Sequence, residues 1–183
     1  MNLKSKTLAW VAVASALTLA TACTNKQGET EAPIFVTLDL PGQPLVISVN
    51  NPVPLQVPTI TLHSHLKNPS APDTAHFADM QVQFYTVEFF RQDGGTLVPP
   101  TQTFGVAGLL PSGGDLTLSN FPLLTGAAIQ QSPFDQLLAF NGGIDRETGL
   151  TEIHMFYRLT FFGDTASGFR VQSETAIGDF IAQ

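Results

Sequence analysis

The chain has 183 residues, of which 43% are apolar and only 13% are charged, and 8 basic against 15 acidic residues give a net charge of −7. So few lysines and arginines exclude the clustered basic surface that a nucleic-acid partner requires. A single cysteine excludes a disulfide scaffold. The 15 glycines and 13 prolines disfavour a long helical bundle. The length predicts one folded domain with room for a targeting segment.

The amino terminus has the pattern of a signal peptide. Lys4 and Lys6 give residues 1–6 a positive charge, and residues 7–22 follow without any charge. An uncharged run of this length suits the apolar region of a signal peptide and is too short to span a bilayer as a helix. The sequence therefore predicts a signal peptide over residues 1–22.

The signal segment ends in Leu19-Ala20-Thr21-Ala22-Cys23, and Cys23 is the only cysteine in the chain. This stretch resembles the lipobox of bacterial lipoproteins, with Ala20 at a position where leucine is usual. The resemblance implies that Cys23 is diacylated, becomes the new amino terminus and anchors the protein through more than one acyl chain. The alternative is a secreted protein that is cleaved after Ala22 and carries a free thiol.

Residues 24–33 are polar and without periodicity, which is typical of a flexible tether. The domain organisation predicted is thus a signal peptide at 1–22, a lipidated cysteine and tether at 23–33, and a β-domain at 34–183. Thr24, rather than aspartate, follows the cysteine, so the resemblance implies a cell-envelope protein, sorted to the outer membrane in a Gram-negative host. Loss of Lys4 and Lys6 leaves the mature chain more acidic, so the lipid and not a basic patch would hold it at the membrane.

From residue 34 onward, proline, glycine and asparagine separate short β-branched and aromatic runs at intervals typical of a sandwich or barrel. The pattern predicts an all-β fold, an antiparallel immunoglobulin-like β-sandwich of about seven to nine strands. Ser132-Pro133 predicts a short helical turn near residues 132–139. The strands predicted lie at residues 34–40, 44–49, 59–67, 80–92, 101–106, 115–118, 151–162 and 169–176.

Three of these segments carry the most specific patterns. In residues 59–67, Ile60 and Leu62 alternate with polar residues, which indicates one buried face. Residues 151–162 alternate in the same way, so we expect a central strand with Tyr157 buried. In residues 80–92 the apolar side chains fall on even-numbered positions up to Phe84 and on odd-numbered positions after it. This change predicts a β-bulge or a strand buried on both faces.

Two histidines of one predicted strand are candidate ligands of a transition metal. His63 and His65 would project from the same face about 7 Å apart, and His76 or His154 could complete a site. The alternative is a polar outer face, because threonines occupy the same row.

The loop at residues 141–149 offers candidate calcium ligands. Asp145 and Glu147 supply carboxylate oxygens, which suit calcium, and Ile144-Asp145-Arg146-Glu147 resembles a turn of cadherin repeats. The remaining motifs of that family are missing from the chain. The alternative is a glycine-rich turn whose side chains satisfy its own backbone.

No catalytic motif is found, because the chain lacks a G-x-S-x-G elbow and a second cysteine. No cofactor is predicted. We therefore expect a non-enzymatic, lipid-anchored envelope protein whose β-domain acts in binding or structural interaction with a protein partner. The alternative is a small metal-dependent or carboxylate-based hydrolase on the same scaffold.

Overall fold

The computed structural model describes residues 32–40, 44–68, 70 and 76–183. One compact unit extends over Ala32–Gln183. The predicted signal peptide, Cys23 and nearly all of the tether lie outside the described residues.

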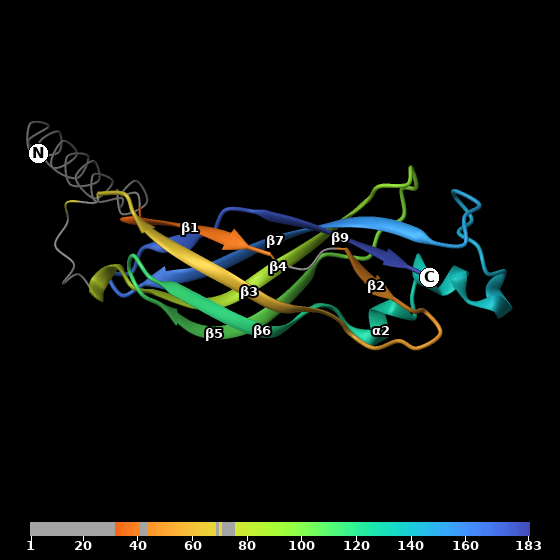
Figure 1. Ribbon diagram of the computed structural model, residues 1–183, viewed down its shortest axis with the longest axis horizontal. Helices are drawn as coiled ribbons and strands as arrows, with labels where there is room; N and C mark the ends of the chain where they lie inside the picture. Colours follow the sequence, from red (N-terminus) through yellow and green to blue (C-terminus); the bar gives the residue numbers. More distant parts are fainter. Residues whose placement is uncertain (1–31, 41–43, 69, 71–75) are drawn as a thin grey trace, which may run out of the picture. The chain divides into compact units, whose positions relative to one another are not determined.

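The described residues form an all-β fold with a few short helical turns (Figure 1). The strands are β1 (Ile34–Asp39), β2 (Leu45–Ile47), β3 (Leu55–Leu66), β4 (Met80–Arg91), β5 (Gln102–Leu110), β6 (Asp115–Leu124), β7 (Ile153–Thr165), β8 (Arg170–Gln172) and β9 (Ala176–Ala182). The helical turns are η3 (His76–Ala78), α2 (Gly126–Ile129), η4 (Phe134–Leu137) and η5 (Ala139–Asn141).

The strands form two sheets. The smaller sheet has the order β1-β3-β6, and the larger has the order β2-β9-β7-β4-β5, with β8 also paired to β7. The predicted all-β, sandwich-like fold is confirmed. The larger sheet is mixed rather than purely antiparallel, because β2 runs parallel to β9. An immunoglobulin-like topology stays a prediction.

The strand registers define two ends of the sandwich (Figure 1). At the entry end, β1 begins at Ile34 opposite Leu66, and β4 begins at Met80 opposite Leu110. At the loop end, β4 finishes at Arg91, and its connection to β5 contacts the loop that precedes β7 through Glu147. The chain therefore enters the sandwich at the end opposite these loops.

Alternating apolar residues from both sheets make up the core. Ile60 and Leu62 of β3 are fully buried, as are Tyr157, Leu159 and Phe161 of β7, which confirms the faces predicted for these strands. β7 is also central, because it pairs with β4 on one side and β9 on the other.

Aromatic contacts join the two sheets. The ring of Phe121 in β6 lies 3.8 Å from that of Tyr85 in β4 and 5.2 Å from that of Phe161, measured between centroids. The Tyr85 hydroxyl also donates to the carbonyl oxygen of Pro122 at 2.7 Å, and burial raises the pKa of this phenol. This cluster fixes β4 and β6 against each other, since stacked or tilted aromatic pairs add to the energy of burial.

The parity change predicted in β4 is a β-bulge. Val82 pairs with Gly163 and Phe84 with Phe162, so the register shifts by one residue between them. Val82 is buried, Phe84 is exposed, and Tyr85 is buried again. The extra residue lets β4 bury apolar side chains on the same face before and after the shift.

Several predicted boundaries were wrong. The segment predicted as one strand at 169–176 contains only the short β8. The pattern missed β9, which begins at Ala176. β6 and β7 extend beyond the predicted strands. The helical turn predicted near 132–139 is present as η4. The helix α2 before it was not predicted. The N-terminus of α2 is capped by the hydroxyl of Thr125, which accepts from the backbone amide of Ala128.

In the part of the chain that the structure describes, no helix is both long and apolar enough to cross a membrane.

Candidate functional site

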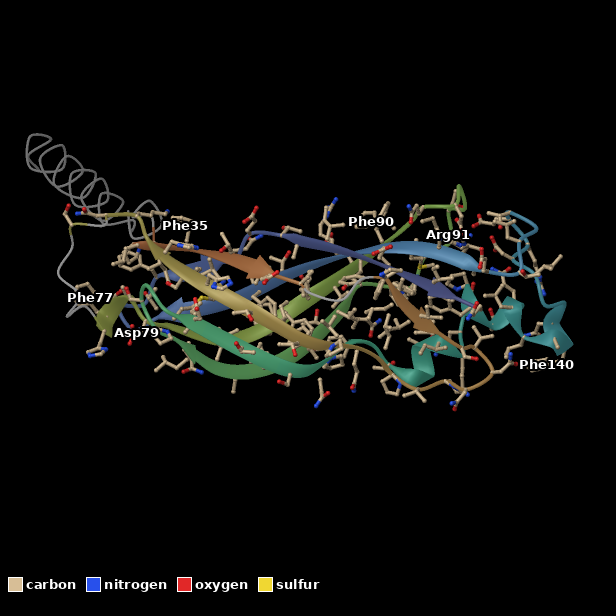
Figure 2. All side chains as sticks on the ribbon, in the orientation of Figure 1. Phe35, Phe77, Asp79, Phe90, Arg91 and Phe140 are labelled. Atoms are coloured by element: carbon tan, nitrogen blue, oxygen red, sulfur yellow. The ribbon has the colours of Figure 1, made fainter. Side chains whose placement is uncertain are left out.

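The loop end holds a buried ion-pair cluster centred on Arg91, the last residue of β4 (Figure 2). The Arg91 side chain is only 2% exposed, and those of Asp93 and Asp145 are 4% and 0% exposed. The guanidinium donates to both oxygens of Asp93 at 2.7 and 2.9 Å and to Asp145 at 2.6 Å. A bidentate pair of this kind is strong and geometrically specific.

Asp145 is further held by its own loop and by η4. One of its oxygens accepts from the side-chain Nε2 of Gln136 at 2.7 Å, and the other accepts from the hydroxyl of Thr148 at 2.7 Å. The side-chain oxygen of Gln136 accepts in turn from the backbone of Arg146 at 3.0 Å. Both Asp145 oxygens are therefore occupied by donors.

Glu147 links this loop to the connection between β4 and β5. Its carboxylate accepts from the backbone amides of Thr96 and Leu97 at 2.7 and 2.8 Å, and from the Thr96 hydroxyl. It also lies 3.6 Å from the Arg91 guanidinium. We call Arg91, Asp93, Gln136, Asp145 and Glu147 the Arg91 network; it cross-links the β4–β5 loop (residues 92–101) to the loop before β7 (residues 142–152).

The network holds its carboxylates ionised. Burial by itself would raise the pKa of Asp145, but hydrogen bonds from Thr148 and Arg91 outweigh it and lower this pKa. In Asp93, burial is likewise outweighed by the bonds from Arg91 and His154. Bonds from the backbone of Leu97 and from Thr96 lower the pKa of Glu147. Desolvation would lower the pKa of Arg91, but its bonds to Asp93 and Asp145 raise it.

This arrangement supports structure rather than reaction. A catalytic base has to reach a substrate proton, whereas the carboxylates of Asp93 and Asp145 face internal donors and are almost inaccessible to solvent. A network whose members are all satisfied rigidifies its surroundings. Its effect here is to hold two long loops in one conformation.

The structure brings together both candidate calcium ligands, Asp145 and Glu147. The positive group that lies between them is the guanidinium of Arg91. In the described residues, no cluster of three or more histidine, cysteine, aspartate or glutamate side chains could hold a metal ion. Calcium binding by the loop stays a prediction.

The histidine candidates lie on β3, and each has its own hydrogen-bond partner. His63 contacts Asp115 at 2.7 Å, and His65 contacts the hydroxyl of Thr37 at 3.0 Å and stacks on Phe35. The two histidines proposed to complete a site are bonded elsewhere: His76 contacts Asp79, and His154 contacts Glu152.

The loops held by the network expose a set of apolar side chains. Phe140 of η5 is 83% exposed, the largest value among the exposed apolar side chains described, and it lies at the same end as Arg91 (Figure 2). We define the loop-end patch as the exposed apolar residues of the loops 92–101 and 142–152 together with Phe140 of η5, which are Leu97, Val98, Phe140, Ile144 and Leu150. Exposed apolar side chains on loops of one end are candidates for an interaction surface.

Sequence reasoning identified Asp145 and Glu147 but missed their cation. Arg91 is the sole basic residue between Lys67 and Arg146, and it directly follows the apolar pair Phe89-Phe90. A lone arginine at the end of a buried strand, with Asp93 two residues later, is a signal that could have indicated a buried ion pair. Gln136 carries no such signal, because its role depends entirely on the placement of η4.

The fold and the network together define an all-β sandwich with a rigid loop end. No family model matches the chain, and no curated protein does so either.

Proposed function

We propose that this protein is a bacterial lipoprotein of the cell envelope whose β-sandwich binds a protein partner through the loop-end patch. Its attachment is through lipid on Cys23, with residues 24–33 as the tether. The lipobox-like Ala20-Thr21-Ala22-Cys23 supports the anchor. Such an anchor needs no membrane-spanning segment.

The position of the patch within the sandwich supports its role. The described chain begins at Ala32, next to the start of β1 at the entry end, whereas the patch lies at the loop end (Figure 1). Ala32 and the loop-end patch therefore lie at opposite ends of the sandwich. Binding residues are often found on loops that a rigid scaffold positions.

The observation that carries the proposal is an exposed apolar surface whose loops are held by side-chain hydrogen bonds. Loops of this length usually lose conformational freedom when they bind, and this cost weakens the complex. Here Glu147 accepts from the backbone amide of Leu97, a residue of the patch. Asp145 accepts from the side chain of Gln136, which lies four residues before Phe140. The patch is therefore preorganised for a partner.

The anchor is tested by replacing the lone thiol. In a bacterial host, the wild-type chain is expected to partition into detergent and to incorporate labelled palmitate. Cys23→Ala is expected to lose the label and either to accumulate as precursor or to be cut after Ala22 by the ordinary peptidase. Because Trp10 is the only tryptophan, the mature protein should show no indole emission. Unlabelled, soluble wild-type protein that keeps indole emission would contradict the anchor.

The binding surface is tested by photo-crosslinking in intact cells. A photoreactive residue at position 140 is expected to give a discrete adduct with one envelope protein. The matched control is position 77, because Phe77 is also an exposed phenylalanine, 61% accessible, but lies at the entry end (Figure 2). Leu97→Asp should abolish the adduct at position 140. Equal adducts at both positions, or an adduct that survives Leu97→Asp, would argue against the loop-end patch.

A further inference from the structure

One lateral side of the sandwich ends in two strands that have neighbours on one side only. Among the described residues, β5 is the last strand of the larger sheet and pairs with β4 alone, and β6 is the last strand of the smaller sheet and pairs with β3 alone. A short turn at residues 111–114 joins them, so both lie on the same side of the sandwich. On the opposite side, the amide of Glu174 donates to the carbonyl oxygen of Val36 in β1 at 2.7 Å, which links the two layers there.

A groove lies between β5 and β6. It has a volume of about 250 Å³ and is lined by Phe104 and Val106 of β5, by Leu118 and Phe121 of β6 and by Tyr85 beneath them. Phe104, Val106 and Leu118 are only partly buried, although they pack on the core. Apolar side chains that face the core are thus left half covered along this side.

The segment that forms this side carries almost no charge. Between Asp93 and Asp135 the sequence contains one charged residue, Asp115, although the chain carries 23 in all. Natural proteins protect long edge strands with charged residues or proline. Neither occurs within Gln102–Leu110 of β5.

We propose that β5 pairs antiparallel with β5 of a second copy, so that two chains form a two-fold symmetric dimer with a sheet continuous across both. The net charge of −7 makes the approach of two copies unfavourable wherever acidic side chains face each other. At the β5–β6 side, two copies can approach each other without bringing acidic side chains of one against acidic side chains of the other. Unpaired backbone groups of an edge strand supply the hydrogen bonds for such an addition.

The sequence of β5 is also compatible with pairing to itself. A two-fold axis at Val106 places Phe104 of one copy opposite Gly108 of the other, which sets a large side chain beside a small one. The exposed residues Thr103, Gly105, Ala107 and Leu109 are all uncharged. In a two-fold interface the same patch serves both copies, so this register satisfies both chains equally. The inference concerns a surface separate from the loop-end patch and does not rest on it.

The test uses the full chain in its membrane, with cysteines introduced along β5. Val106→Cys is expected to give disulfide-linked dimers under mild oxidation, because the two-fold axis sets it opposite its own copy, with a lower yield from Ala107→Cys and none from Leu109→Cys. The control is Ile177→Cys, which is 62% exposed on β9, a strand that does not pair with β5, and should give none. The unmodified chain reports the background from Cys23. Dimer formation there would indicate a free thiol and count against the anchor, not against pairing through β5.

A charge on the edge provides the second measurement. In detergent, light scattering should give the mass of a dimer for the full chain, and Ala107→Lys should weaken dimerisation by at least tenfold, while the melting temperatures of the two proteins stay equal when both are diluted to monomers. Ala107→Gln, which is polar but neutral, should keep the dimer. A monomer at every concentration, crosslinking at Ile177→Cys equal to that in β5, or crosslinks from β5 to a different protein would each overturn the proposal.

Discussion

Replacing Arg91 by methionine is expected to lower the free energy of unfolding by about 3–5 kcal/mol, the range for removing one partner of a buried ion pair. Methionine keeps much of the apolar stem but leaves Asp93 and Asp145 buried without a cation. Both carboxylates are at most 4% exposed, so water cannot replace the lost guanidinium. Urea denaturation followed by circular dichroism measures the change.

The matched control is Arg170→Met. Arg170 also forms an ion pair, with Asp164 at 3.7 Å, but its side chain is 86% exposed. Exposed pairs contribute about 0–1 kcal/mol, so this variant should unfold nearly as the wild type does. Equal losses in the two variants would show that the Arg91 network is not a buried ion cluster.

The dependence of this loss on pH separates an electrostatic cause from a packing defect. Folding lowers the pKa of Asp93 and Asp145 below their ordinary value of 3.8. Their contribution to stability is therefore fully present well above pH 3.8 and is lost as the pH falls toward the lowered, folded-state pKa. In Arg91→Met, burial without a cation raises the pKa of both groups, and acid relieves the penalty by neutralising them. The difference between variant and wild type should thus shrink as the pH falls through the raised pKa of the variant and on toward the lowered pKa of the wild type, whereas a packing defect would keep it constant.

Truncation of Tyr157 to alanine is expected to cost about 3–5 kcal/mol, the range for deleting a large buried aromatic side chain. Tyr157 is fully buried in the central strand β7. It pairs with Gly178 of β9, where an added Cβ would lie within 2.3 Å of the tyrosine ring and hydroxyl. The ring therefore occupies space that glycine leaves open, and Gly178 has no side chain with which to fill the cavity.

The neighbouring residue supplies the control for Tyr157→Ala. Phe156 is the same kind of side chain on the opposite face of β7, and it is 37% exposed. Phe156→Ala should cost less than half as much, because part of its surface is already in water. Both values come from chemical denaturation, and a loss below about 1 kcal/mol for Tyr157→Ala would place its ring outside the core.

Periodicity was the most reliable guide to this fold. The alternation in residues 59–67 and 151–162 correctly predicted the buried faces of β3 and β7, because a strand with one face on the core has a side-chain period of two. The parity change near Phe84 correctly predicted the bulge in β4, since only an inserted residue keeps the apolar side chains on one face. Strand ends were predicted less well, because β6 and β9 are held by partners that are distant in sequence.

The sequence by itself determined the all-β class, the buried faces of the long strands and the acidic, charge-poor character of the chain, because these depend on local pattern and composition. It also indicated Asp145 and Glu147 as unusual loop residues. Only the tertiary structure decided that their cation is Arg91, 54 residues away from Asp145 in sequence. The parallel pairing of β2 with β9 and the shared side of β5 and β6 were decided in the same way. The physical reason is that ion pairs, strand order and open edges arise from contacts between distant segments, and no local pattern of residues encodes those contacts.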